Sequence, residues 1–195
     1  CQNKTSCAPL VPQLIRGLIL LFIDSNEQVL HLSWEALNSL TKNLDTKEQI
    51  EYVNEVRNAV RHAASDLKSV GTNQTLLPGF CIEKGIAPIL PIFREAILNG
   101  NAEQKEQAAD GLSEVIQMTS PTALKSSIVN MTGALIRILG DRYIWNVKVA
   151  VLDTLSLLLS KAGMCLRPFI PQLQQTFLKA LIDQNRIVRL RAANA

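Results

Sequence analysis

Two histidines and two acidic pairs are the residues of this sequence best suited to proton transfer or metal binding. His31 and His62 have no spaced cysteine or carboxylate partners, which a metal ligand or a catalytic base needs. The acidic pairs in 48–51 and 103–106 stand at helical spacing beside lysines, as is typical of a solvated helix face. The sequence therefore predicts no catalytic site.

Cofactor, metal and membrane signals are also missing. Neither GxxxxGK[ST] nor GxGxxG occurs, and the four cysteines form no CxxC pair: Cys1, Cys7, Cys81 and Cys165. We expect reduced thiols in the cytoplasm, no metal, no cofactor and no small-molecule substrate. A net charge of +3 is too mild to indicate nucleic-acid binding. The longest apolar run, 18–23, is shorter than the roughly 20 residues of a membrane span.

A short segment carries the residue types that most often dominate the energy of protein interfaces. Arg142, Tyr143 and Trp145 lie within four positions, with Arg137 before them and Lys148 after them. We predict a protein-binding site of these five residues, with Arg142 as an anchor that makes bidentate hydrogen bonds to a carboxylate. Three structural alternatives remain open: Trp145 can pack beneath its turn as core, Arg142 can simply lie in water, and Lys148 can serve a structural ion pair.

Substitutions separate these interpretations. Arg142→Ala should weaken partner binding at least tenfold, about 1.4 kcal/mol, with little change in melting temperature. Arg57→Ala, on a charged helix elsewhere, is expected to change neither quantity.

Internal repeats indicate what positions these residues. The stretch 11–36 aligns without a gap on 170–195, and both copies read as a helix with an early proline, an Ile-Asp-x-Asn turn and a second helix. A third copy covers 129–159 and a fourth begins near Pro88. A unit of about 40 residues with two helices is typical of HEAT arrays. We predict an all-α HEAT-repeat α-solenoid of stacked antiparallel helix pairs, more than 60% helical.

The turns carry a second pattern. An Asp opens the turn of most units, where it could cap the following helix. Lys148 and Arg189 follow the turns of the last two units and could pair with the Asp of a neighbouring unit. The first unit has Leu30 at that place and so lacks the pair.

One region departs from the repeat. Residues 46–67 read as a longer charged helix, followed by a loop that extends to about residue 80. We interpret 1–195 as a single array with this irregular helix and loop at about 46–80, a hinge between two stacks. The pattern stops within a helix at Ala195, so we expect a piece of a longer protein.

Three stretches go beyond a generic HEAT pattern: 77–92 (LPGFCIEKGIAPILPI), 133–148 (GALIRILGDRY and WNVK) and 167–174 (RPFIPQLQ). They resemble the C-terminal, kinase-binding region of the giant HEAT-repeat translational activators of the general amino-acid control pathway. These are ribosome-associated activators of the kinase that phosphorylates initiation factor two alpha. The resemblance covers nearly the whole chain and is less distinctive over residues 1–75.

This resemblance implies a cytoplasmic, non-catalytic scaffold that passes a starvation signal to the kinase. In the family, the C-terminal HEAT region binds the RWD domain of the kinase, other RWD-containing proteins compete for it, and the full-length protein contacts the ribosome. Two alternatives remain: a segment that contacts ribosomal RNA, and a generic HEAT protein-interaction module, which would lack the GDRYIWNVK stretch.

Overall fold

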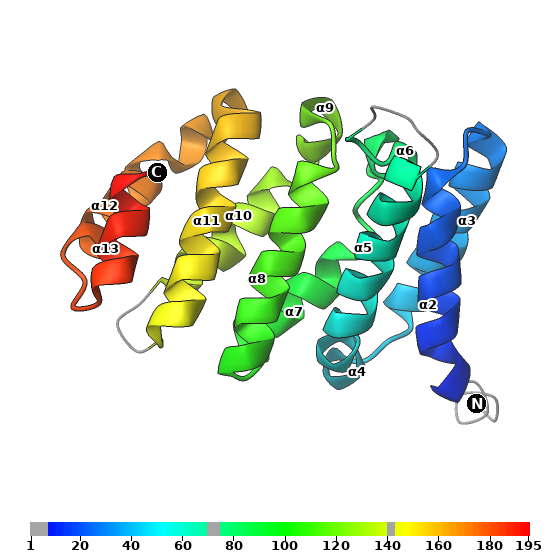
Figure 1. The fold of residues 1–195 in the computed structure, drawn as a ribbon, viewed down its shortest axis with the longest axis horizontal. Coiled ribbons are helices and arrows are strands. Elements are labelled where there is room, and N and C mark those ends of the chain that lie inside the picture. The colour runs from blue at the N-terminus through cyan, green and yellow to red at the C-terminus, as the bar shows by residue number, and fades with distance from the viewer. Residues whose placement is uncertain (1–7, 70–74, 140–142) are drawn as a thin grey trace.

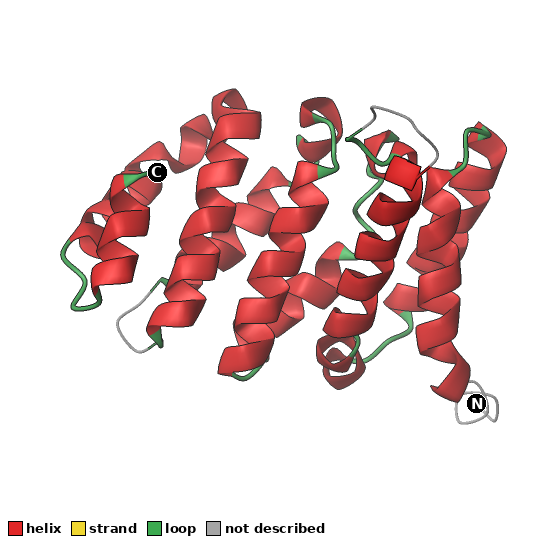
Figure 2. Ribbon diagram, viewed as in Figure 1, coloured by secondary structure: helices red, strands yellow, loops and turns green. Residues whose placement is uncertain are grey.

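The computed structural model describes residues 8–69, 75–139 and 143–195 (Figure 1). About 80% of the protein is helical, and the described ranges contain no strand, which confirms the all-α prediction (Figure 2). Three 3-10 segments are η1 (Ala8–Leu10), η2 (Leu21–Ile23) and η3 (Gly163–Phe169). The α-helices are α2 (Val11–Leu20), α3 (Glu27–Lys42), α4 (Thr46–Glu51), α5 (Val53–Ser69), α6 (Pro78–Cys81), α7 (Leu90–Asn99), α8 (Ala102–Gln117), α9 (Pro121–Leu124), α10 (Ile128–Ile138), α11 (Trp145–Ala162), α12 (Ile170–Leu181) and α13 (Arg186–Ala193).

Prolines and asparagines determine where many helices begin. A proline occupies the first turn of α2, α7 and α12, where its missing N–H breaks no helical hydrogen bond. Helices α3, α8 and α13 each begin after an asparagine whose side chain accepts a backbone N–H of the first turn: Asn26, Asn101 and Asn185.

The turn aspartates do not cap these helices themselves, so the predicted capping role is wrong. Asp24 Oδ1 accepts the N–H of Asn26 at 2.8 Å, and Asp183 Oδ1 accepts the N–H of Asn185 at 2.8 Å. Each Asp therefore shapes the turn two residues ahead of the capping asparagine.

The helices form two layers (Figure 1). Helices α2, α5, α8, α11 and α13 lie side by side in one layer, each packed against the next. In the other layer α7, α10 and α12 each pack on the helix that follows them in sequence, α8, α11 and α13. Short α4 packs on α7, and α3 packs on α2 at the end of the stack.

The first helix pair is reversed relative to the last one. The sequence alignment equates α2 with α12, but α2 lies in the layer of α13 and packs on α5. As a result, the turn between α2 and α3 lies at the opposite edge of the stack from the turn between α12 and α13 (Figure 1). Similar sequences therefore occupy different positions in the array.

The irregular region contains two helices rather than one. The chain leaves helical geometry at Tyr52, between α4 and α5, so the expected single helix over 46–67 is divided. Asp45 and Glu48 form a reciprocal capping box that begins α4. Because α4 packs on α7 while α5 lies between α2 and α8, this region joins the reversed first pair to the regular units.

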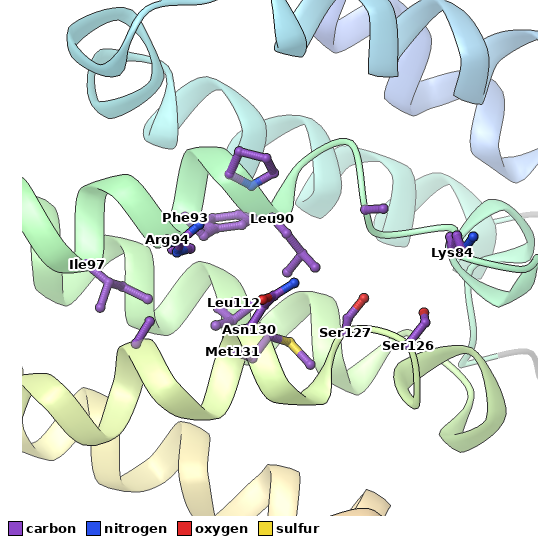
Figure 3. Close-up of a pocket in the computed structure, with 13 residues that line it drawn as sticks. Lys84, Leu90, Phe93, Arg94, Ile97, Leu112, Ser126, Ser127, Asn130 and Met131 are labelled. Atoms are coloured by element: carbon purple, nitrogen blue, oxygen red, sulfur yellow. The ribbon is translucent and has the colours of Figure 1, made fainter.

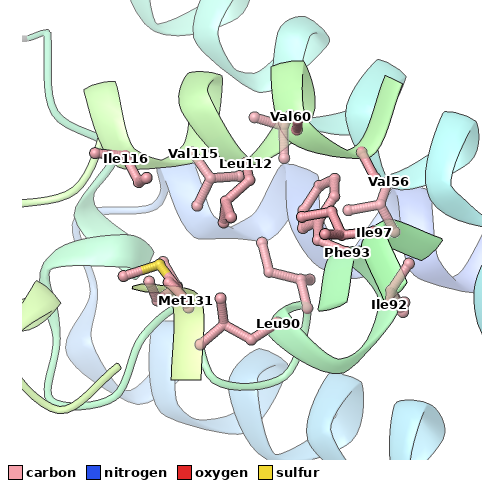
Figure 4. Close-up of a cluster of buried hydrophobic side chains, with 14 of the residues drawn as sticks. Val56, Val60, Leu90, Ile92, Phe93, Ile97, Leu112, Val115, Ile116 and Met131 are labelled. Carbon is pink, nitrogen blue, oxygen red and sulfur yellow. The ribbon is translucent and has the colours of Figure 1, made fainter. Parts of the chain in front are cut away.

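A continuous apolar core runs between the layers (Figure 4). The ring of Phe93 is fully buried within it, beside Val56 and Leu112. Gly111 on α8 permits this close packing, since a Cβ there would stand 2.6 Å from Phe93 Cε1. The rings of Phe22 and Phe80 meet edge to face with centroids 5.7 Å apart, closing the core near α6.

One buried hydroxyl is unsatisfied. Thr132 on α10 is fully buried, and its Oγ1 has no hydrogen-bond partner among the described residues. Thr132→Val keeps the shape of the side chain and removes the desolvated hydroxyl, so the free energy of unfolding should rise by about 1 kcal/mol. Urea unfolding followed by circular dichroism tests this; an unchanged or lower midpoint would show that Oγ1 is satisfied in solution.

One helical run, Trp145–Leu181, is long and apolar enough to cross a membrane by length and composition alone. Within the structure, 44% of its most apolar window is buried, and the run is divided into α11, η3 and α12. Because α11 and α12 lie in different layers, the run is not one straight helix (Figure 1). Core helices of soluble proteins pass the same test, so the run is weak evidence for a membrane segment.

Candidate functional site

The turns before α8 and α13 and the first residues of α11 lie along one edge of the stack (Figure 1). A basic residue stands in the first or second turn of each following helix: Lys105, Lys148 and Arg189. Lys105 Nζ donates to the carbonyl oxygens of Leu98 and Gly100, at 3.0 and 2.5 Å. Arg189 Nη1 donates to the carbonyl oxygens of Asp183 and Gln184, at 2.7 and 2.9 Å. Lys105 and Arg189 therefore satisfy carbonyl acceptors at the end of α7 and in the turn after α12.

Two of these cations also connect neighbouring units. Lys148 Nζ lies 2.6 Å from Asp183 Oδ2, and both side chains are about nine-tenths buried. Lys105 Nζ stands 5.9 Å from the ring centroid of Tyr143, within range of a cation–π contact. The geometry thus agrees with the expected pairing of Lys148 with the Asp of the next unit, and it assigns Lys148 a structural role.

The pKa of Asp183 reflects this environment. Burial raises the pKa of the carboxyl, but the hydrogen bonds from Lys148 and from the N–H of Asn185, with the charges of Lys148 and Arg189, hold it below its ordinary value. Asp183 is therefore ionised at neutral pH, and its charge is neutralised within the protein.

A groove opens beside this ion pair. It has a volume of about 810 Å³ and is bounded by the segment that begins α11 and by the turn between α12 and α13. Its lining residues are Tyr143, Trp145, Lys148, Lys179, Ile182, Asp183, Gln184 and Asn185. Two large apolar side chains are exposed there: Trp145 has 44% of its surface accessible and Ile182 has 82%. Lys179 is exposed and has no ion-pair partner among the described residues.

The predicted site residues separate in the structure. Tyr143 and Trp145 line the groove, and Trp145 is exposed rather than packed beneath the turn. Lys148 lines it too, but its ammonium is committed to Asp183. Arg137 is exposed at the end of α10 and is not among the groove's lining residues. Arg142 lies outside the described residues, so its role stays a prediction.

The proposed control residue Arg57 is not inert. Its side chain is 14% exposed, and Nη2 lies 2.9 Å from Glu114 Oε1 and 3.2 Å from Asp110 Oδ2 on α8. Arg61 also pairs with Glu114, at 2.7 Å. The expectation that Arg57→Ala leaves stability unchanged is therefore wrong, because the change would leave two carboxylates of α8 without this partner. Arg16, exposed on α2, is a better control.

Sequence reasoning missed Lys179 and Ile182. Both belong to the unit after Trp145, so no local spacing joins them to the cluster around Tyr143. The signal that could have found them is the repeat itself, because stacking brings consecutive turns to one edge.

Within the described ranges no group of three or more His, Cys, Asp or Glu side chains could hold a metal ion. Cys81 and Cys165 are free thiols; Cys1 and Cys7 lie outside the described residues.

Comparison with known proteins connects this array to one family. Residues 1–84 match the family described as "Stalled ribosome sensor GCN1-like, HEAT repeats". Over all 195 residues the chain is 52% identical to "Stalled ribosome sensor GCN1" of Homo sapiens. It is 42% identical over 185 residues, 94% of the chain, to "Protein ILITYHIA" of Arabidopsis thaliana. It is 34% identical over 186 residues, 95% of the chain, to "eIF-2-alpha kinase activator GCN1" of Saccharomyces cerevisiae.

The chain spans 7% of the length of each of these relatives. No solved structure matches it. The helical repeats, the family match over residues 1–84 and the similarity along the whole chain agree with one another: residues 1–84 match GCN1-like HEAT repeats, and the whole chain is similar to one segment of GCN1 proteins.

Proposed function

We propose that this chain is a non-catalytic docking module that binds the RWD domain of the initiation factor two alpha kinase and so promotes its activation in amino-acid starvation. The names of two relatives support the pathway, since the Saccharomyces cerevisiae and Dictyostelium discoideum proteins are both called "eIF-2-alpha kinase activator GCN1". The observation that supports the proposal for this segment is the groove between the start of α11 and the turn between α12 and α13, at the edge of the stack that we call the turn edge. Trp145 and Ile182 are exposed there beside Lys179.

The chemistry of the groove suits a folded protein partner. Trp145 and Ile182 offer apolar area, and Lys179 offers a positive charge that no described carboxylate neutralises. A complementary partner surface has an apolar side chain next to a carboxylate, the combination that gives both affinity and orientation. We expect a complex that buries roughly 1,200–2,000 Å² in total.

The proposal includes a cellular setting. The module acts in the cytoplasm, and the longer protein contacts the ribosome, as the name "Stalled ribosome sensor" of its relatives suggests. Other RWD-containing proteins compete for the same edge. The array supplies position and contact surface, and we propose no chemical step for it.

Substituting the groove tests this assignment. Trp145→Ala should weaken binding of the kinase's RWD domain at least tenfold, about 1.4 kcal/mol, because an exposed aromatic anchor is lost. Arg142→Ala is expected to do the same. Surface plasmon resonance measures both affinities, and thermal melting should show little change.

The matched control is Arg16→Ala, an exposed residue of α2 at the other end of the stack. It should leave affinity and melting temperature unchanged. If Trp145→Ala and Arg142→Ala both bind like the unmodified chain, the surface around Trp145 is not the binding surface.

A salt series separates this proposal from contact with ribosomal RNA. Binding to RNA falls steeply with salt because counterions are released, whereas binding to an RWD domain through apolar and few charged contacts changes modestly. The chain should bind the RWD domain at physiological salt. Strong, salt-sensitive binding to ribosomal RNA with no binding to the RWD domain would favour the RNA alternative.

A further inference from the structure

A second hollow lies away from the turn edge, between α7 and α10 (Figure 3). These two helices are neighbours in the layer opposite α11 and α13. In Figure 3 the hollow extends from Lys84 at one end to Ile97 at the other, with α7 on one side and α10 on the other. None of its lining residues is shared with the groove that contains Trp145.

The floor of this hollow is apolar and belongs to the core. Leu90, Phe93, Leu112 and Met131 are each at most 9% exposed, yet they line the cavity. Its volume is about 200 Å³. This is less than the roughly 300–1,000 Å³ that small-molecule sites occupy, so the cavity suits one large apolar side chain better than a whole metabolite.

The rim is polar and positively charged. Lys84 and Arg94 are both exposed, and no carboxylate is among the lining residues. Lys84 Nζ lies 4.0 Å from Oε1 of neighbouring Glu83, an exposed ion pair at the limit of contact. Arg94 has no ion-pair partner in the described part of the chain; the carboxylate of neighbouring Glu95 instead accepts a hydrogen bond from Asn99 Nδ2 at 2.8 Å. Ser126 and Asn130 add exposed hydrogen-bonding groups on the α10 side.

The distinctive stretch 77–92 builds one wall of the cavity. Lys84 has a φ of 57°, the left-handed region that lysine rarely adopts. Trp34 Nε1 holds this loop by donating to the carbonyl oxygen of Lys84 at 3.0 Å, and the N–H of Ala87 donates to the same oxygen at 2.8 Å. The next residue is Gly85, and glycine is needed there because a Cβ would overlap the backbone of residues 79–80. The rim lysine therefore stands on a fixed backbone.

We propose that the cavity between α7 and α10 binds a peptide segment of a partner protein that carries one large apolar side chain next to acidic residues. The apolar side chain enters between Phe93 and Met131, and the flanking carboxylates meet Arg94 and Lys84. This surface is additional to the proposed RWD-binding edge and does not depend on it, because the two sites share no residue.

The same observations argue against RNA as the occupant. RNA would be attracted by the two cations, and the guanidinium of Arg94 could stack on one base, but binding of a single strand also relies on exposed aromatic rings on which successive bases stack. The one aromatic residue that lines this cavity, Phe93, is fully buried, and the floor is otherwise aliphatic.

Selection from a phage-displayed library of short random peptides on the immobilised 195-residue chain tests the proposal. Enriched peptides should carry a large apolar residue next to Asp or Glu, and a synthetic copy should bind in solution. Arg94→Glu should weaken its binding at least tenfold by reversing the charge of the rim. Asn130→Trp should weaken it similarly by covering the cavity. Arg16→Glu and Trp145→Ala should have no effect.

A second readout locates the bound peptide. The chain has three methionines, so a methyl-labelled spectrum is simple, and the Met131 signal should shift while that of exposed Met164 stays in place. The proposal is overturned if selected peptides lack the acidic-apolar pattern, or if they bind Arg94→Glu as well as the unmodified chain. It is also overturned if poly(U) RNA binds in a manner abolished by Arg94→Glu and no peptide does.

Discussion

Phe93→Ala is expected to lower the free energy of unfolding by about 4 kcal/mol, within the range for a buried aromatic residue truncated to Ala. The ring is fully buried at the centre of the array and contacts α8 where Gly111 permits close approach (Figure 4). The cavity cannot close easily, because helices on both sides are held by their own neighbours. Urea unfolding followed by circular dichroism measures the change.

Two further variants serve as controls for Phe93→Ala. Phe93→Leu retains most of the volume and should cost less than about 1.5 kcal/mol. Trp145→Ala removes a larger ring, but one that is 44% exposed at the edge, and should cost much less than Phe93→Ala. If Phe93→Ala loses no more stability than Trp145→Ala, the continuous core described here is wrong.

Lys148→Met is expected to lower the free energy of unfolding by about 3 kcal/mol, because it leaves the buried carboxylate of Asp183 without its main partner. Methionine preserves much of the volume of the lysine stem, so the loss reports the charge rather than the packing. Asp183→Asn in the same chain removes the stranded charge and keeps an acceptor for the N–H of Asn185. The double variant should therefore be more stable than Lys148→Met alone.

The contribution of Asp183 to the free energy of unfolding should decrease at acidic pH. The pKa of Asp183 is lower in the folded chain than in the unfolded chain, so folding favours the ionised form. Its stabilising effect is fully present above about pH 4, the ordinary pKa of an aspartate, and is lost as pH falls through the lower folded value. The stability difference between the unmodified chain and Asp183→Asn should shrink in that acidic range. A difference that persists unchanged at the lowest pH would contradict the ion pair.

The repeat pattern predicted most of the fold because helical periodicity is local. Prolines and turn residues in 11–36 and 170–195 correctly indicated paired helices with a turn between them. The sequence could not show that α2 lies in the layer of α13, since an alignment records which helices are paired and not which neighbours each one packs against. That depends on the two helices that follow the pair, since α4 packs on α7 while α5 packs against both α2 and α8.

The site was predicted in part for the same reason. Tyr143 and Trp145 lie in one turn, so their proximity was visible in the sequence, whereas Lys179 and Ile182 reach the groove only through stacking. Lys161 is a similar case. Its Nζ donates to the carbonyl oxygens of Ile116 and Thr119 at 2.9 and 3.1 Å, so a side chain of α11 satisfies carbonyl groups at the C-terminal end of α8. Contacts between units can therefore be identified only once the arrangement of the helices in the array is known.

Isothermal titration of the 195-residue chain with the RWD domain of the initiation factor two alpha kinase measures directly whether this segment binds it. We expect a saturable complex with one RWD domain per chain at physiological salt, weakened at least tenfold by Trp145→Ala. Circular dichroism and thermal melting of the same sample establish that the chain is folded. A folded chain that gives no binding heat with the RWD domain at several temperatures would show that this segment is not the docking module for that domain.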